Sequence, residues 1–299
     1  MRTSRREPSF ITIFFRDLIS HFGYTFFIAV VSSLVTVLVF NLLLKSTLIA
    51  SQQKNQKEEL YVERGSPYDN RTMGSESAEV FFHGPRNLKK IALTFDAEMT
   101  DGMKASFLSK KVSSSYDKRI VDILNQTNTK ATIFLTGMWI ELYPDATNEL
   151  AKNPLFELGS HSYTDSSFHG YCYGLKQIPT TLKLEDVGAT EKLLREHAGI
   201  DNKLFRFPGG CYTPEDVKLV NQVGDTVVHW DVSGADGFNT NTKQIERTII
   251  DNTQNGSIII LHLNGPPTAP KTAEALPRII TELKKKGFEF VKVSELLNL

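Results

Sequence analysis

The chain has 299 residues, 40% of them apolar, which is enough to bury the core of one large domain and still carry appended segments. Its 34 basic and 34 acidic residues balance, which excludes a strong field for binding polyanions. No stripe of basic and aromatic residues interrupts this balance, so we expect no nucleic-acid partner.

Residues 22–44 form the first predicted element, a helix that crosses a membrane. This run contains 23 residues without a charge, which is long enough to span the hydrocarbon core. Arginines in the preceding segment, 1–21, favour a cytoplasmic N-terminus and an extracytoplasmic position for the rest of the chain. A cleaved signal peptide is the alternative, but its apolar region is normally shorter. We therefore expect an uncleaved, single-pass anchor.

Residues 45–87 are polar and show no periodicity, so they are predicted to be a linker. From residue 88 to residue 299, short strand-like runs alternate with helix-like runs. Strands are predicted at 90–96, 131–137, 155–161, 203–208, 226–232, 257–263 and 288–293, and helices at 116–126, 139–151, 183–197, 214–222, 242–253 and 272–286. This alternation indicates an α/β fold with a parallel sheet, and about seven such units favour a barrel or a near-barrel.

Five of the predicted strands end in polar or ionisable residues. In chain order these are Asp96; His161, Asp165 and His169; Arg206 and Pro208; His229, Trp230, Asp231 and Asp236; and His262. A single histidine at a strand end is more often structural than catalytic. Because the carboxyl ends of parallel strands share one rim, five such ends predict an active site there.

These five strand ends, in this order, resemble the motifs of the polysaccharide deacetylase family, also known as the NodB-homology domain and carbohydrate esterase family four. The resemblance covers about residues 88–299. It implies a distorted (β/α) barrel that removes acetyl groups from N-acetylglucosamine polymers or acetylated xylan, usually with a divalent metal ion. The matching positions are Thr94, Phe95 and Asp96 in the first motif, Arg206, Pro208 and Gly210 in the third, and Leu261 and His262 in the fifth.

The resemblance also implies roles for individual residues. Asp96 would be the general base, His262 the general acid and Arg206 the clamp on Asp96, and the backbone N–H of Gly209 would help to bind the oxyanion. The expected substrate-binding residues are Pro208, Gly209, Gly210, Trp230 and Asp236. These roles suit the hydrolysis of an acetamide, which needs a base for water, a donor for the oxyanion and an acid for the leaving amine.

The metal-binding positions depart from the family pattern of one aspartate and two histidines. Ala97 stands at the aspartate position, and Asp165 stands at the second histidine position. Glu98 is the nearest replacement, so we expect Glu98, His161 and Asp165 to hold Zn²⁺ or a harder divalent ion, with His169 as a reserve ligand. The alternative is that the metal has been lost and that Glu98 is a solvated turn residue.

Two cysteines, Cys172 and Cys211, follow the third and fourth strands and form either a disulfide or two free thiols. Nearby aromatic residues are candidates for stacking against sugar rings, namely Phe168, Tyr171, Tyr173, Tyr212 and Trp230. We expect a membrane-anchored hydrolase that removes acetyl groups from peptidoglycan or an exported glycan. A catalytically idle glycan-binding module on the same fold is the alternative that the changes at Ala97 and Asp165 favour, and a hydrolase of some other amide is a third possibility.

Overall fold

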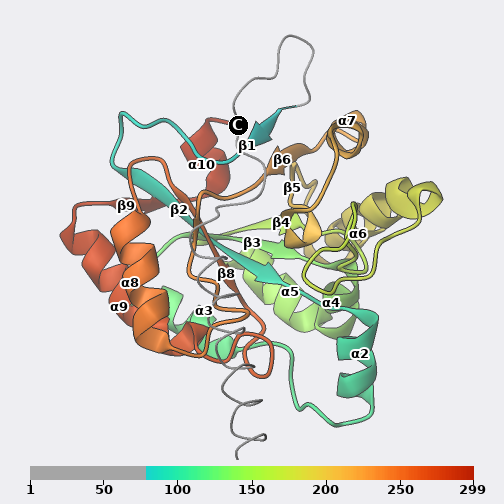
Figure 1. Cartoon of the computed structure of the whole chain (residues 1–299), viewed down its shortest axis with the longest axis horizontal. Helices are drawn as coiled ribbons and strands as arrows, with labels where there is room; N and C mark the ends of the chain where they lie inside the picture. Colours follow the sequence, from blue (N-terminus) through green and yellow to red (C-terminus); the bar gives the residue numbers. More distant parts are fainter. Residues whose placement is uncertain (1–78) are drawn as a thin grey trace, which may run out of the picture. The chain divides into compact units, whose positions relative to one another are not determined.

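The computed structural model describes residues 79–299, in which nine strands form one sheet (Figure 1). The strands are β1 (Val80–Phe81), β2 (Lys90–Ala97), β3 (Ala131–Leu135), β4 (Phe156–Ser160), β5 (Leu204–Phe205), β6 (Thr226–Val228), β7 (Val232–Ser233), β8 (Ile258–His262) and β9 (Glu289–Val291). Their order is β1-β6-β5-β4-β3-β2-β8-β7, with β9 paired to β2, and every ladder is parallel.

Helices surround this sheet. They are α2 (Asp101–Leu108), α3 (Lys118–Gln126), α4 (Gly137–Leu142), α5 (Pro144–Lys152), α6 (Lys183–Ala198), α7 (Pro214–Gln222), α8 (Thr242–Asn252), α9 (Thr272–Lys285) and α10 (Val293–Leu297), with 3₁₀ turns at Thr180–Leu182 and Pro208–Gly210. Helix α9 packs against α8 and α3, while α6 packs against α4, α5 and α7 (Figure 1). The parallel strands and surrounding helices confirm the predicted α/β class.

The predicted barrel is observed as a curled half-barrel. Strands β1 and β7 are the two ends of the sheet, and no ladder joins them within residues 79–299. Strand β2 pairs with β3, β8 and β9 and is buried along all but its first residue. Its side chains contribute to one large apolar core with residues of α3, α4, α8 and α9.

Several boundaries differ from those predicted. The single helix expected at 139–151 is two helices, because Pro144 lacks a backbone N–H and begins α5. Strand β1 lies within the predicted linker 45–87 and pairs with β6. The segment 1–21, the expected anchor 22–44 and the rest of that linker lie outside the described residues. Within residues 79–299, no helix is both long and apolar enough to cross a bilayer.

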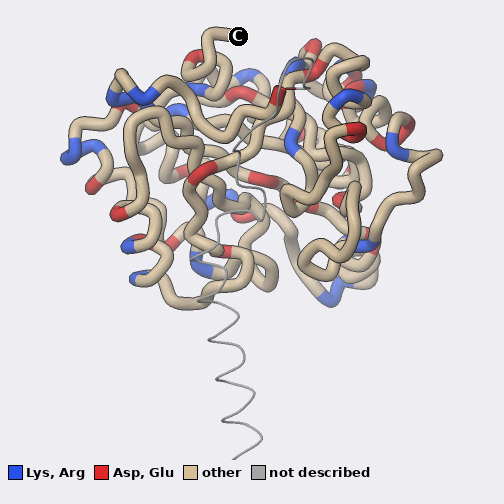
Figure 2. The backbone as a smooth tube through the Cα atoms, turned by 45° about the horizontal axis from the view of Figure 1, so that its top comes forward, with Lys and Arg blue, Asp and Glu red and all other residues tan. Residues whose placement is uncertain are grey.

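Charged residues of both signs are interspersed along the described chain (Figure 2). This distribution agrees with the balanced composition of the chain.

Candidate active site

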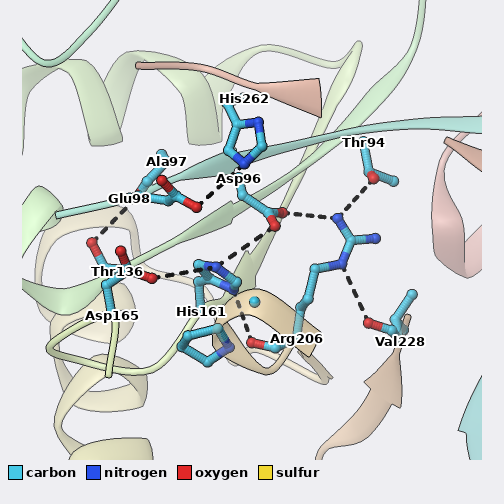
Figure 3. Close-up of polar contacts among 12 residues, drawn as sticks. Thr94, Asp96, Ala97, Glu98, Thr136, His161, Asp165, Arg206, Val228 and His262 are labelled. Carbon is cyan, nitrogen blue, oxygen red and sulfur yellow. Dashed lines mark hydrogen bonds and ion pairs between the residues drawn. The ribbon is translucent and has the colours of Figure 1, made fainter. Parts of the chain in front are cut away.

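The parallel register brings the predicted catalytic residues to one edge of the sheet. Asp96 on β2 lies opposite His262 on β8. The backbone N–H of Arg206 donates to the carbonyl of Ser160 at 2.9 Å, which places the segment after β5 beside the segment after β4. Figure 3 shows the side chains of Asp96, His161, Arg206 and His262 converging at this edge. The strand-end prediction therefore identified residues that are close in space.

Asp96 is bound by a fully buried arginine. Nη1 of Arg206 donates to Asp96 Oδ1 and to Thr94 Oγ1, both at 2.8 Å. The Nε of Arg206 donates to the carbonyl of Val228 at 3.3 Å (Figure 3), and its Nη2 donates to the carbonyl of His229 at 3.1 Å. Burial alone would raise the pKa of Asp96, but the guanidinium, with weaker help from two nearby histidines, holds it below its usual value. Asp96 is therefore an ionised carboxylate, as a general base requires.

His262 is oriented by a buried carboxylate. Its Nδ1 lies 2.8 Å from Asp236 Oδ1, and its backbone N–H donates to Asp236 Oδ2 at 2.9 Å. Because a carboxylate only accepts, Nδ1 carries the proton, and Nε2 points into the site 3.3 Å from Glu98 Oε1. The hydroxyl of Thr272 also donates to Asp236. Burial lowers the pKa of His262, but Asp236 and Glu98 outweigh it and raise that pKa well above the usual value.

Asp236 was predicted as a substrate-binding residue, and the structure places it behind His262. The carboxylate is fully buried and accepts hydrogen bonds from His262 and Thr272. This arrangement keeps His262 protonated and aimed at the site, as in other carboxylate–histidine pairs of hydrolases.

Glu98, His161 and Asp165 form a cluster in which one ligand atom from each residue lies within 4.8 Å of the others. Nδ1 of His161 lies 2.9 Å from the carbonyl of Arg206 and must donate to it. Burial lowers the pKa of His161, so the ring is neutral and its Nε2 presents a lone pair. That lone pair faces Asp96 Oδ2 at 3.6 Å and Asp165 Oδ1 at 3.8 Å (Figure 3).

These donor atoms fit a divalent cation. Within the described part of the chain, neither His161 Nε2 nor either carboxylate oxygen of Asp165 has a hydrogen-bond partner, although all three atoms are buried. Burial, with Glu98 and Asp96 nearby, raises the pKa of Asp165 well above its usual value. An orphaned lone pair surrounded by carboxylates is costly unless a cation joins them. Two carboxylates and an imidazole suit Zn²⁺ and harder divalent ions.

Two polar side chains that the sequence analysis did not identify bind the backbone just after Asp96. Asn264 accepts from the backbone N–H of Glu98 at 3.0 Å and donates to its carbonyl at 2.7 Å. Thr136 donates to the carbonyl of Ala97 at 3.1 Å. The signal that could have found Asn264 is its position two residues after His262, at the same strand end. His169, the reserve ligand, is exposed and is not part of the cluster.

The turn after β5 forms another wall of the site. Gly209 and Gly210 both have positive φ angles, of 61° and 69°. The N–H of Gly210 donates to the carbonyl of Phe207 at 2.9 Å. Trp230 stacks on His229 with ring centroids 3.9 Å apart, and both rings lie against Gly210. Burial lowers the pKa of His229 to about 4, so this ring stays neutral.

The remaining aromatic candidates divide between the core and the surface. Phe168 and Tyr212 are buried in an apolar cluster, which excludes them from stacking against a sugar. Tyr173 and Phe238 are partly exposed and lie 5.6 Å apart between ring centroids.

Cys172 and Cys211 form a disulfide beside this pair, so the alternative of two free thiols is wrong.

Comparison with known proteins agrees with this geometry. The family model for polysaccharide deacetylases matches residues 83–228. A peptidoglycan-N-acetylglucosamine deacetylase of Bacillus cereus is 30% identical over 210 residues, covering 70% of this chain and 69% of the relative. The crystal structure of the Bc1960 peptidoglycan N-acetylglucosamine deacetylase matches with a TM-score of 0.63 and 26% identity, over 75% of this chain and 94% of that one. A family-four pseudoenzyme from Bacillus anthracis shares the fold, with a TM-score of 0.60 and 22% identity over 74% of this chain and 69% of its own.

Proposed function

Because the chain belongs to the polysaccharide deacetylase family, we propose that it hydrolyses the acetamide of N-acetylglucosamine units in a polysaccharide, with peptidoglycan as the first candidate. One observation carries the proposal. An arginine-clamped carboxylate, Asp96, and a carboxylate-oriented imidazole, His262, face the same cluster of orphaned ligand atoms. Relatives named as peptidoglycan deacetylases support the choice of substrate, and an exported glycan is the other candidate.

The residues of the chain divide the chemistry among them. A divalent ion held by Glu98, His161 and Asp165 would polarise the acetamide oxygen and lower the pKa of the attacking water. Asp96, which Arg206 keeps ionised, takes a proton from that water. The backbone N–H of Gly209 is proposed to stabilise the negative oxygen of the tetrahedral intermediate.

Collapse of the intermediate breaks the C–N bond and requires a proton on the nitrogen. Nε2 of His262 faces the site and donates that proton, while Asp236 stabilises the imidazolium from behind. Acetate and a free amine leave as products. The partly exposed Tyr173 and Phe238 offer ring faces to the glycan at the edge of the site.

We also propose that residues 22–44 anchor the protein in a membrane, with the N-terminus cytoplasmic and the catalytic domain outside. The uncharged run and the arginines before it support this topology. The Cys172–Cys211 disulfide agrees with an oxidising compartment.

The test of function is acetate release from chitin oligomers and from peptidoglycan fragments by the full-length protein in detergent. Asp96→Asn and His262→Ala should each lower the rate at least ~100-fold, the range expected for general acid–base groups. His169→Ala is the control, because this histidine is exposed and lies outside the cluster of Glu98, His161 and Asp165. An unchanged rate in either variant would remove that residue from the mechanism.

The metal proposal has its own test. The purified protein should hold about one divalent ion per chain, chelation should abolish acetate release, and adding the ion back should restore it. His161→Ala should lose the ion outright. Glu98→Ala is the discriminating variant, because Ala97 cannot ligate. If Glu98→Ala binds metal and turns over like the parent, Glu98 is only a turn residue.

A catalytically idle glycan-binding module is the second candidate, favoured by the changes at Ala97 and Asp165. It predicts that the protein binds N-acetylated glycans, carries no ion and releases no acetate from any of them. The chain keeps Asp96, which Arg206 binds, and His262, which Asp236 orients and which lies beside Glu98. A binding module needs neither a base nor an acid, so their retention argues against this candidate.

A further inference from the structure

The Cys172–Cys211 disulfide joins two loops that both carry groups of the proposed site. Cys172 lies in the loop after β4, which begins with His161 and contains Asp165. Cys211 directly follows the Pro208–Gly210 turn, which begins two residues after Arg206. The covalent bond therefore connects the proposed metal-binding loop with the proposed oxyanion-binding turn.

This turn is enclosed on two sides. A Cβ atom on Gly209 would lie 2.4 Å from the Sγ of Cys172, and one on Gly210 would lie 2.5 Å from the Nε2 of His229. The disulfide thus covers one face of the turn, and the His229–Trp230 stack covers the other. Both glycines have positive φ and no side chain to limit their motion, so the turn is confined by this packing and by the hydrogen bond from the N–H of Gly210 to the carbonyl of Phe207.

The cysteine loop itself adopts a costly backbone conformation. Tyr173 and Gly174, the central residues of a tight turn, have φ angles of 52° and 87°, and the N–H of Leu175 donates to the carbonyl of Cys172 at 2.8 Å. A tyrosine with positive φ is uncommon and persists only where its surroundings hold it. Here the disulfide and the packing of Tyr173 against Gly209 and Phe238 do so.

We propose that Cys172–Cys211 is a positioning disulfide, which holds the backbone N–H of Gly209 where the acetamide oxygen becomes negative. An oxyanion donor contributes only if it is already in place, within about 2.7–3.1 Å of the developing charge. A Gly-Gly turn released on one face samples other conformations, and the donor is then present for only part of the time. The proposal rests on the proposed deacetylase function.

The experiment compares the full-length parent with Cys172→Ser/Cys211→Ser, using a chitin oligomer as substrate. Because complete loss of one oxyanion donor costs ~10²–10³ in kcat, we expect a displaced donor to lower kcat about tenfold to a hundredfold. The affinity for Zn²⁺ should change less than about twofold, since the substitutions leave the metal ligands in place, and KM should change less than kcat even though the disulfide also holds Tyr173. A methylphosphonamidate analogue of the acetamide, which mimics the tetrahedral oxyanion, should bind more weakly by about the same factor as kcat/KM.

Two results would overturn the proposal. One is a double variant that keeps the kcat of the parent. The other is a parallel loss of kcat, metal affinity and substrate binding, which would indicate a general structural role. If the double variant does not fold, Gly209→Ala tests the same turn with the disulfide intact, because its Cβ must displace Cys172. That variant should show the same selective loss of kcat, and an unchanged kcat would refute the proposal. Failure of the deacetylase function itself is distinguishable, because the parent would then release no acetate.

Discussion

Replacing Arg206 with methionine tests whether the buried guanidinium compensates the charge of Asp96. Nη1 of Arg206 lies 2.8 Å from Asp96 Oδ1, and both side chains are buried. Removing one partner of a buried ion pair costs ~3–5 kcal/mol, because the remaining charge is uncompensated. Since 1 kcal/mol moves Tm by ~2–4 °C in a domain of this size, we expect Tm to fall by ~6–20 °C. Thermal unfolding followed by circular dichroism measures this change.

A double-mutant cycle with Asp96→Asn isolates the ion pair. The carbonyls of Val228 and His229 lose their donor in both Arg206→Met backgrounds, so that cost cancels and only the charge interaction remains. We expect the double variant to recover ~0.5–3 kcal/mol relative to the sum of the single changes. Lys118→Met is the control, because Lys118 pairs with Asp122 at 3.1 Å and both side chains are exposed, by 65% and 47%. Such an exposed pair should be worth less than ~1 kcal/mol. Additive losses in the Arg206–Asp96 cycle would refute the reasoning.

Three further predictions concern titration and topology. Asp236→Asn should lower the pKa of His262 and move the alkaline limb of the kcat–pH profile to lower pH, and an unmoved limb would contradict the assigned role. Burial, with Glu191 nearby, raises the pKa of Asp225 to about 8, so the folded chain holds a proton that the unfolded chain releases near pH ~4. The free energy of unfolding should therefore fall as pH rises from ~4 to ~8; Asp225→Asn should flatten this dependence, and equal slopes would refute it. Protease added to intact cells with an accessible outer surface should degrade the domain beyond residue 45, whereas full protection would exclude the proposed topology.

The sequence predicted the central strands and their polar ends well, because each combines a continuous apolar run with an abrupt polar stop. Asp96, Arg206 and His262 were found in this way, and parallel pairing brings them together. Strand β1 lies in the polar segment that was predicted to be a linker, and the single strand predicted at 226–232 is β6 followed by the start of β7. Helix α2 was missed because it buries no residue, so its sequence has no apolar stripe.

Side-chain roles were harder to predict than positions. Asp236 was assigned to the substrate from its place in the motif, whereas its contacts show that it orients His262. Asn264 and Thr94 act through hydrogen bonds to partners distant in the sequence, Glu98 and Arg206 respectively. Such contacts depend on rotamers and on strand register, which a single sequence does not specify.

The two departures from the family's metal motif have a common physical consequence. Glu98 contacts the proposed proton donor, through Nε2 of His262 at 3.3 Å, and belongs to the proposed metal-binding cluster. Asp165 brings a second carboxylate to the same cluster, where its oxygens have no hydrogen-bond partner among the described residues. The cluster is therefore more acidic than one with two imidazoles, and a cation is correspondingly more important to its stability. Loss of the ion would leave Glu98 to pair with His262 alone, so we infer that metal removal disturbs both the activation of water and the release of the proton by His262.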